Sequence, residues 1–475
     1  MRTSPSYTAS YRLEVDEANL SVSQIVDAVS ATGAQIKGLD VADSDRGRIV
    51  IDLTCDMRDS EHRREVEKVL DDLEGVHTSS VADQTFMAHV GGKIEVKPKV
   101  PLRNRDDLSR AYTPGVARVC TAIHDTPSKA HLLTMKANSV AVVSDGTAVL
   151  GLGDIGPEAA LPVMEGKAVL FKQFGDVDAW PVVLDTKDTE EIISIVKAIA
   201  PAYGGINLED ISAPRCFEIE ERLRAELDIP VFHDDQHGTA IVVLAALINA
   251  LKLVNKKIED VRIVVSGVGA AGSAIIKLLL AQGARDIVGY GRTGALAGDD
   301  IEGMHPSRAW LAQNTNPRLV HGSLKEGIVD ADVFIGVSHG NILEPSDIAK
   351  MAPGAIVFAL ANPTPEVDPI AAAQYASIVA TGRSDYPNQI NNVLAFPGLF
   401  RGLLDAKVKE ITTEVLRVAA VAIASVISED ELSPSYIIPG AFDKRVAPAV
   451  SKAVRRAVRD LPTVDIPVQP DMDVN

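Results

Sequence analysis

The strongest constraint on the fold is a glycine-rich segment at residues 261–276, VRIVVSGVGAAGSAII. An apolar run of strand length precedes Gly267, Gly269 and Gly272, which have the spacing G-x-G-x-x-G, and an apolar run of helical character follows them. In a strand-turn-helix unit, the first glycine makes the tight turn, the second lets the backbone approach a pyrophosphate, and the third lets the helix pack on the strand. The segment therefore predicts a Rossmann-type dinucleotide-binding unit, with an ordinary glycine-rich turn as the alternative.

The end of the next predicted strand, residues 286–290, indicates which dinucleotide is bound. In such units this strand commonly ends in an acidic residue that binds the ribose 2′-hydroxyl of NAD. Here Gly291 stands at that position and Arg292 follows. A missing carboxylate removes repulsion against a 2′-phosphate, and Arg292 could pair with it. The pattern favours NADP over NAD, unless Arg292 simply points into solvent.

Apolar runs of strand length alternate with helical segments along most of the chain, which is typical of parallel α/β sheets. The strands are predicted at 139–143, 181–185, 231–232, 261–266, 287–290, 333–336, 356–359 and 377–380. Helices near 411–427 and 447–460 close the chain. In sheets of this kind, ligands bind at the carboxyl ends of the strands.

The first 85 or so residues follow a different pattern, β-α-β-β-α-β. Its strands are predicted at 7–15, 35–41, 48–54 and 76–81, and its helices at 22–29 and 58–73. This order is that of the ferredoxin-like split βαβ unit. No cluster of catalytic residue types is visible in it.

Composition narrows the class of protein. The 475 residues carry 47 Lys and Arg against 65 Asp and Glu, a net charge of −18, so nucleic-acid binding as the main role is excluded. The most apolar stretch, 240–251, is too short to span a bilayer, and the first residues resemble no signal peptide. Cys55, Cys120 and Cys216 lie far apart and predict reduced thiols. We expect a cytoplasmic protein with no membrane partner.

Paired acidic residues follow two predicted strands: Glu209 and Asp210, and Asp234 and Asp235. Folding alone explains such pairs poorly because they crowd like charges at one sheet edge. Mg²⁺ or Mn²⁺ prefers such oxygen ligands and would relieve the repulsion. The flanking histidines raise zinc as an alternative, but a third ligand at a suitable spacing is missing. Capping of a helix by Asp235, without a metal, is the other alternative.

Two residues upstream have no obvious role from spacing alone. Tyr112 lies in SRAYTPGVARVC, and Lys167 lies in LPVMEGKAVL. A tyrosine in such a segment is most often a core or rim aromatic, and a lysine in such a helix is most often solvated.

Seven segments, taken together and in order from about 104 to about 405, resemble bacterial-type malic enzymes. They are YTPGVARVC, SDGTAVLGLGDIGPEAALPVMEGKAVLFK, INLEDISAPRCFEIE, VFHDDQHGTAIV, SGVGAAGSA, ALANPTPEV and NQINNVLAFPG. The N-terminal module is similar to the ACT domain of some members. The resemblance implies oxidative decarboxylation of L-malate to pyruvate and CO₂ with reduction of NAD(P)⁺. It also implies an α/β fold with an ACT domain at 1–88, a malic domain at 89–236 and a Rossmann-type NAD(P)-binding domain at 237–475.

The resemblance also implies roles for single residues. Lys167 matches the general base that takes the C2 hydroxyl proton, and Tyr112 matches the general acid that protonates C3 of the enolate. Asp234 matches a carboxylate that supports the base. The remaining matches are Glu209, Asp210 and Asp235 as metal ligands, Gly267, Gly269, Gly272, Arg292 and Asn362 at the coenzyme, and Asn362 and Asn392 at malate.

One position departs from the family pattern. Larger eukaryotic members place an arginine that binds a malate carboxylate where this chain has Ala148. Another group must then hold that carboxylate, and backbone N–H groups of the loop at 151–156 are candidates.

Two other functions remain open at this point. A dehydrogenase of amino or other hydroxy acids would not generally need the metal that the paired acids indicate. A sensor that has lost catalysis would be expected to lack the catalytic residue types, which are all present. The ACT-like module either binds a small effector or serves only as a structural or dimerising unit, and the resemblance implies a homodimer or a higher oligomer.

Overall fold

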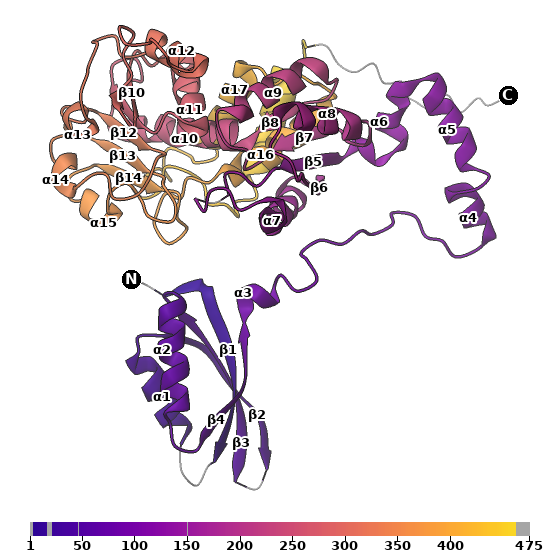
Figure 1. Cartoon of the computed structure of the whole chain (residues 1–475), viewed down its shortest axis with the longest axis vertical. Helices are drawn as coiled ribbons and strands as arrows, with labels where there is room; N and C mark the ends of the chain where they lie inside the picture. The colour runs from indigo at the N-terminus through magenta and orange to yellow at the C-terminus, as the bar shows by residue number, and fades with distance from the viewer. Residues whose placement is uncertain (1–2, 17–20, 46, 150, 462–475) are drawn as a thin grey trace. The chain divides into compact units, whose positions relative to one another are not determined.

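The computed structural model describes residues 3–16, 21–45, 47–149 and 151–461, and the chain divides into two compact units, 1–96 and 97–475 (Figure 1). The predicted boundary at 88/89 lies shortly before that division. The predicted boundary at 236/237 lies inside helix α10 (Asp234–Leu253), and the regions on both sides of it belong to the second unit. The three-domain division stays a prediction.

The N-terminal unit has the element order predicted from its sequence. It consists of β1 (Ser4–Asp16), α1 (Val22–Ala31), β2 (Gln35–Asp45), β3 (Arg48–Met57), α2 (Ser60–Asp71), β4 (Val76–Asp83) and α3 (Gln84–Met87). The sheet order is β2-β3-β1-β4, and its pairs are antiparallel. Alternate residues of β1, such as Tyr11 and Leu13, are buried against α1 and α2, since successive strand residues point to opposite faces. The ferredoxin-like arrangement is confirmed, whereas membership of the ACT family stays a prediction.

The second unit begins with a parallel sheet of order β6-β5-β7-β8. The strands are β5 (Ser139–Ser144), β6 (Asp178–Val183), β7 (Gly205–Leu208) and β8 (Val231–His233), and the helices are α7 (Pro157–Gly175), α8 (Thr189–Ile199) and α9 (Arg215–Glu226). The strand expected at 181–185 starts earlier, because Ser139 of β5 pairs with Asp178. Val140 and Val142 face the core that contains α7, whereas Ala141 and Val143 face α8 and α9.

A six-stranded sheet follows, with the order β11-β10-β9-β12-β13-β14. Its strands are β9 (Arg262–Ser266), β10 (Asp286–Gly291), β11 (Gly294–Ala295), β12 (Val333–Gly336), β13 (Ile356–Ala359) and β14 (Ile378–Thr381). All pairs are parallel except β10 with β11. Helices α10 and α11 (Ala270–Ala281) cover one face, and α14 (Pro345–Ile348) and α15 (Pro369–Ala372) cover the other (Figure 1). The strand order reverses between β9 and β12, which is where doubly wound sheets bind their ligands.

Helix α10 joins the two sheets. It packs against α11 and α17 (Thr413–Ala424), and α16 (Phe396–Ala406) and α18 (Val446–Ala457) complete this layer. Within the described residues, α10 is the one helix long and apolar enough to cross a membrane, but 72% of its apolar window is buried inside the protein. A core helix passes the same test, so α10 gives little reason to expect a membrane span. The cytoplasmic location stays a prediction.

Candidate active site

The acidic pairs meet at the carboxyl edge of the first parallel sheet. Glu209 and Asp210 follow β7, and Asp234 and Asp235 form the first turn of α10 directly after β8. Because β7 and β8 are parallel neighbours, both pairs emerge at the same edge. One ligand oxygen from each of Glu209, Asp210 and Asp235 lies within 4.8 Å of the others.

Asp235 does not cap the helix that it helps to begin. The N-cap residue of α10 is His233, and no side chain caps this end. Instead, Asp235 Oδ2 accepts a hydrogen bond of 2.8 Å from the backbone N–H of Asp210. Asp210 itself has φ of 54°, in the left-handed region that aspartate tolerates better than most residues. The two loops are thereby joined at the carboxylate cluster.

Lys167 lies next to this cluster rather than in solvent. It belongs to α7, and only 7% of the residue is exposed. Its Nζ lies 2.5 Å from Asp234 Oδ2, 2.9 Å from Glu209 Oε1 and 4.2 Å from the ring centroid of Phe396. The side-chain amide of Asn392 donates to the same oxygen of Asp234. Four of the predicted site residues are therefore in direct contact.

Burial and neighbouring charges shift the pKa values of Lys167 and of the carboxylates around it. Burial disfavours the charged form of Lys167, but the carboxylates of Asp234 and Glu209 outweigh it and raise the pKa of the lysine. Burial raises the pKa of Glu209 well above its usual value, and the neighbouring carboxylates add to the rise. Burial and the charge of Asp235 raise the pKa of Asp210 to about 7. The cluster carries more negative charge than Lys167 can balance.

The residues present fit a divalent cation. Asp210 Oδ2 and Asp234 Oδ1 are buried without a hydrogen-bond partner, a costly condition that a cation would relieve. Asn207 donates a 2.8 Å hydrogen bond to Glu209 Oε2 and so fixes the orientation of that carboxylate. Three carboxylates form a hard oxygen donor set, which suits Mg²⁺ or Mn²⁺. In the described part of the chain, the one candidate metal cluster contains no histidine, so the zinc alternative gains nothing from the structure.

Each of the three glycines after β9 has a different structural role. Gly267 has φ of 99°, and a Cβ there would lie 2.6 Å from the Val337 carbonyl oxygen. A Cβ on Gly272 would lie 1.7 Å from the Gly267 carbonyl oxygen, so only glycine lets α11 pack against the turn. Gly269 has nothing within 4 Å of a built Cβ, which leaves its backbone open to a ligand. This turn lies where the strand order reverses.

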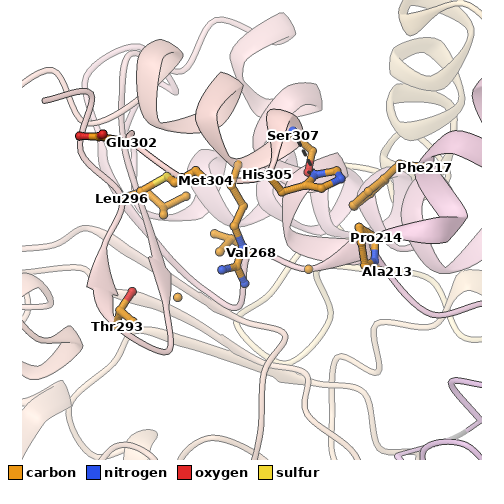
Figure 2. Close-up of a pocket in the computed structure, with 14 residues that line it drawn as sticks. Ala213, Pro214, Phe217, Val268, Thr293, Leu296, Glu302, Met304, His305 and Ser307 are labelled. Atoms are coloured by element: carbon orange, nitrogen blue, oxygen red, sulfur yellow. Dashed lines mark hydrogen bonds between the residues drawn. The ribbon is translucent and has the colours of Figure 1, made fainter. Parts of the chain in front are cut away.

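A cavity of about 350 Å³ opens beside this turn (Figure 2). Figure 2 shows Pro214 and Phe217 on one side, with Val268 and His305 opposite them. Its lining residues are Ala213, Pro214, Phe217, Val268, Gly269, Gly291, Thr293, Leu296, Glu302, Gly303, Met304, His305, Ser307 and Arg308. Arg292 is exposed and does not line the cavity, whereas Arg308 of α12 (Pro306–Asn314) does.

Asn362 lies where a loop of the six-stranded sheet meets a loop of the four-stranded parallel sheet. It follows β13 and is exposed, and its carbonyl oxygen would lie 2.9 Å from a Cβ on Gly151. The loop that begins at Gly151 thus touches the coenzyme-side loop. Gly153 and Gly156 have positive φ values and open space where a Cβ would stand. The backbone N–H of Ala148 is already used, since it donates to the Asp210 carbonyl oxygen.

Comparisons with known proteins identify this arrangement. The sequence matches "Malic enzyme, N-terminal domain" over residues 91–224 and "Malic enzyme, NAD binding domain" over residues 236–459. The chain belongs to the malic enzyme family. It is thus an oxidoreductase that oxidises and decarboxylates malate with NAD(P)⁺.

Relatives of both coenzyme types are similar to this malic enzyme. It is 58% identical over 446 residues to the NAD-dependent malic enzyme of Geobacillus stearothermophilus, covering 94% of this chain and 93% of the relative. It is 45% identical over 406 residues to the NADP-dependent malic enzyme of Escherichia coli (strain K12), covering 80% of this chain and 53% of the relative. A solved structure of the NAD-dependent malic enzyme from Thermotoga maritima is 51% identical, with a TM-score of 0.76, covering 79% of this chain and 99% of that one.

Tyr112 is the predicted catalytic residue that the structure does not bring to the cluster. It lies at the end of α4 (Arg105–Ala111), its side chain is 67% exposed, and no described contact joins it to Lys167. The following helix α5 (Val116–Asp125) has no buried residue, although Val116, Val119 and Ile123 form an apolar stripe along it. Val116, Val119 and Ile123 are half-buried, whereas Ala117, Arg118 and Cys120 of the same helix are exposed.

Several residues of this malic enzyme site were not predicted from its sequence. Asn207 precedes Glu209 by two positions on β7, so period-two alternation could have placed both on one face. Phe396 carried no signal, because it reaches Lys167 from a helix far along the chain. Arg308 and Glu302 lie in a connection after β11 whose path the local pattern does not fix.

Proposed function

We propose that this malic enzyme oxidises L-malate with Lys167 as general base beside a Mg²⁺ or Mn²⁺ ion held by Glu209, Asp210 and Asp235. One observation carries the proposal: Lys167 is buried and contacts Asp234 and also Glu209, which belongs to the carboxylate cluster. A solvated or purely structural lysine would not need to lie among four carboxylates, because each buried charge there must be compensated.

The described residues supply the proton chemistry. When bound, the cation would neutralise the ligand carboxylates and stabilise the negative charge of the enolate that remains after CO₂ leaves. Lys167 must be neutral before it can take the C2 hydroxyl proton as hydride leaves C2 for the nicotinamide. Asp234, 2.5 Å from Nζ and with a pKa raised by burial, is the group in reach that can accept the proton of the ammonium. Asn392 holds the oxygen of Asp234 that faces Lys167.

Tyr112 protonates C3 of the enolate, and we place it in the site of a second copy of the chain. A tyrosine suits the task because it stays protonated at neutral pH until its proton is needed. Its 67% exposure and the unburied α5 fit an arm that docks on another subunit. Leu102, Leu108 and Met135 on the same stretch are also exposed, which a lone subunit would not favour. The expected homodimer is then required for catalysis.

The coenzyme is proposed to bind along the turn of Gly267, Gly269 and Gly272, with its adenosine half in the adjoining cavity. We favour NAD⁺. The preference for NADP predicted from Gly291 and Arg292 finds no support, since Arg292 does not line the cavity and Glu302 does. A carboxylate there suits a ribose 2′-hydroxyl and opposes a 2′-phosphate. The relative at 58% identity is named as NAD-dependent.

The N-terminal unit is proposed to bind a small effector, as its ferredoxin-like fold and its similarity to ACT domains suggest. It has its own hydrophobic core, built from β1, β3 and the two helices. The alignment with the Geobacillus stearothermophilus enzyme covers 94% of this chain and therefore extends into this unit. A structural or dimerising role for the unit is the competing proposal.

The deciding experiment is nicotinamide absorbance with L-malate and Mn²⁺, with NAD⁺ and NADP⁺ compared side by side and EDTA as control. We expect EDTA-sensitive reduction, stoichiometric pyruvate and a faster rate with NAD⁺. Reduction that survives EDTA would refute the metal site. Reduction without pyruvate would point to a dehydrogenase that does not decarboxylate, and a faster rate with NADP⁺ would restore the preference predicted from the sequence.

A further inference from the structure

We propose that a buried hydrogen-bond chain, Glu220 to Gln236 to His233, positions Asp235 as a metal ligand. The inference rests on the proposed metal site and assigns roles to three residues that the mechanism does not use. All three are buried, and His233 is fully so. They are positioning residues, because they act through Asp235 and not on the substrate.

Glu220 anchors the chain from helix α9. Its carboxylate accepts hydrogen bonds from Gln236 Nε2 at 2.9 Å, from His237 Nε2 at 3.0 Å and from the backbone N–H of His233 at 3.2 Å. Three donors from the corner between β8 and α10 therefore converge on one carboxylate. A carboxylate with this many donors is fixed in orientation, and it fixes the corner in turn.

The donors and acceptors determine how Gln236 and His233 are oriented. An ionised carboxylate only accepts hydrogen bonds, so Gln236 must turn its NH₂ group toward Glu220. The same Nε2 lies 2.8 Å from His233 Nδ1, and that ring nitrogen must therefore be the acceptor. The proton of a neutral His233 ring is then on Nε2. This assignment follows from the hydrogen bond that Nδ1 accepts from Gln236.

His233 Nε2 lies 3.2 Å from Asp235 Oδ2, a close polar contact that is not aligned as a hydrogen bond, and this ring nitrogen has no hydrogen-bond partner among the described residues. The backbone N–H of Asp210 donates to the same oxygen at 2.8 Å. Both described contacts of the Asp235 carboxylate thus fall on Oδ2, and we expect Oδ1 to face the cation. Metal-binding carboxylates and histidines in proteins commonly have such outer partners, and losing one weakens metal binding about 10–100-fold.

The test measures Mn²⁺ affinity directly, from the electron paramagnetic resonance signal of free Mn²⁺ titrated into the full-length protein. The variants are Glu220→Gln, which replaces an acceptor by an amide of the same shape, and Gln236→Met, which keeps the length of the side chain. Glu190→Gln is the matched control, because it makes the same change in an exposed carboxylate that pairs with Arg222 of α9 and is not in the chain of donors. Circular dichroism melting shows which variants remain folded.

We expect Glu220→Gln and Gln236→Met to raise the Kd for Mn²⁺ about 10–100-fold, with wild-type affinity in Glu190→Gln. Because the chain only positions a ligand, kcat should return toward the wild-type value at saturating Mn²⁺. Folded variants that bind Mn²⁺ as tightly as wild type would overturn this inference alone. Wild-type protein that binds no Mn²⁺ would overturn the metal site and the inference with it. A kcat that stays low at saturating Mn²⁺ would assign these residues to the chemistry instead.

Discussion

If Tyr112 acts on the site of a second subunit, two inactive variants should restore each other's activity. In a chain with Tyr112→Phe, Lys167 is intact, and in a chain with Lys167→Ala, Tyr112 is intact. A mixed dimer then has one site with both residues and one site with neither. Random pairing of equal amounts makes about half of the dimers mixed, so we expect about a quarter of wild-type activity. Action within one subunit would give no recovery, since neither chain carries both residues.

A mixture of wild-type chains with a double variant provides a matched control, because the remaining fraction of activity differs between the two arrangements. Wild-type chains are paired with equal amounts of the double variant Tyr112→Phe, Lys167→Ala. If Tyr112 acts across the dimer, mixed dimers are inactive and about a quarter of the activity of the same amount of wild-type protein remains, whereas action within one subunit leaves about half. Two affinity tags isolate the mixed species after co-expression, and pyruvate formation with L-malate and Mn²⁺ is the readout. Purified mixed dimers of the two single variants without activity would refute the arrangement.

Four further outcomes are expected. Lys167→Ala should lower kcat at least about 100-fold while Mn²⁺ and coenzyme still bind, and wild-type turnover would remove Lys167 from the mechanism. In EDTA, the free energy of unfolding should fall by up to about 4 kcal/mol between pH 4 and pH 7. The reason is that folded Asp210, with a pKa of about 7, retains a proton that the unfolded chain has lost; equal urea midpoints at pH 5 and pH 8 would contradict this. Glu366→Gln should lower the free energy of unfolding by about 1–3 kcal/mol and raise KM for the coenzyme. The buried carboxylate of Glu366 accepts hydrogen bonds from the backbone N–H groups of Ser338 and Ala361, each at 3.0 Å, in the loops after β12 and β13. An unchanged melting temperature would argue against this role. Deleting residues 1–88 should keep basal activity and abolish any effector response, and a response that persists would place the effector elsewhere.

Those features of the site that depend on local sequence were predictable. The apolar strand before Gly267 and the apolar helix after Gly272 identify the dinucleotide turn without any knowledge of the rest of the chain. The acidic pairs could be placed at one edge because parallel strands end together. The two-residue periodicity of the N-terminal strands likewise sufficed to locate them along the chain, since one face of that sheet is buried.

Contacts between residues far apart in the sequence could not be predicted. Hydrophobic patterning shows which face of a helix is buried, but it does not show which element packs against that face. Spacing alone predicts a solvated Lys167, because a lysine in such a helix is most often exposed. Only the contacts from α10 and α16 show that it is enclosed. The exposure of Tyr112 was equally invisible. From spacing alone, a tyrosine in such a segment is most often a core or rim aromatic, and we propose that a second copy of the chain covers it.

The charges around Lys167 give one physical account of why these residues occur together. Burial raises the pKa of Glu209, Asp210 and Asp234, so in the metal-free site these groups hold a proton up to a higher pH than free carboxyl groups do. Asp235 differs, because its contact with His233 outweighs burial and lowers its pKa. This carboxylate is therefore ionised first and offers the initial ligand. Protons and the cation then compete for the remaining oxygens, and the positive charge of a bound cation would offset part of the negative field that keeps Lys167 charged. Metal binding and activation of the base are, on this account, one electrostatic event.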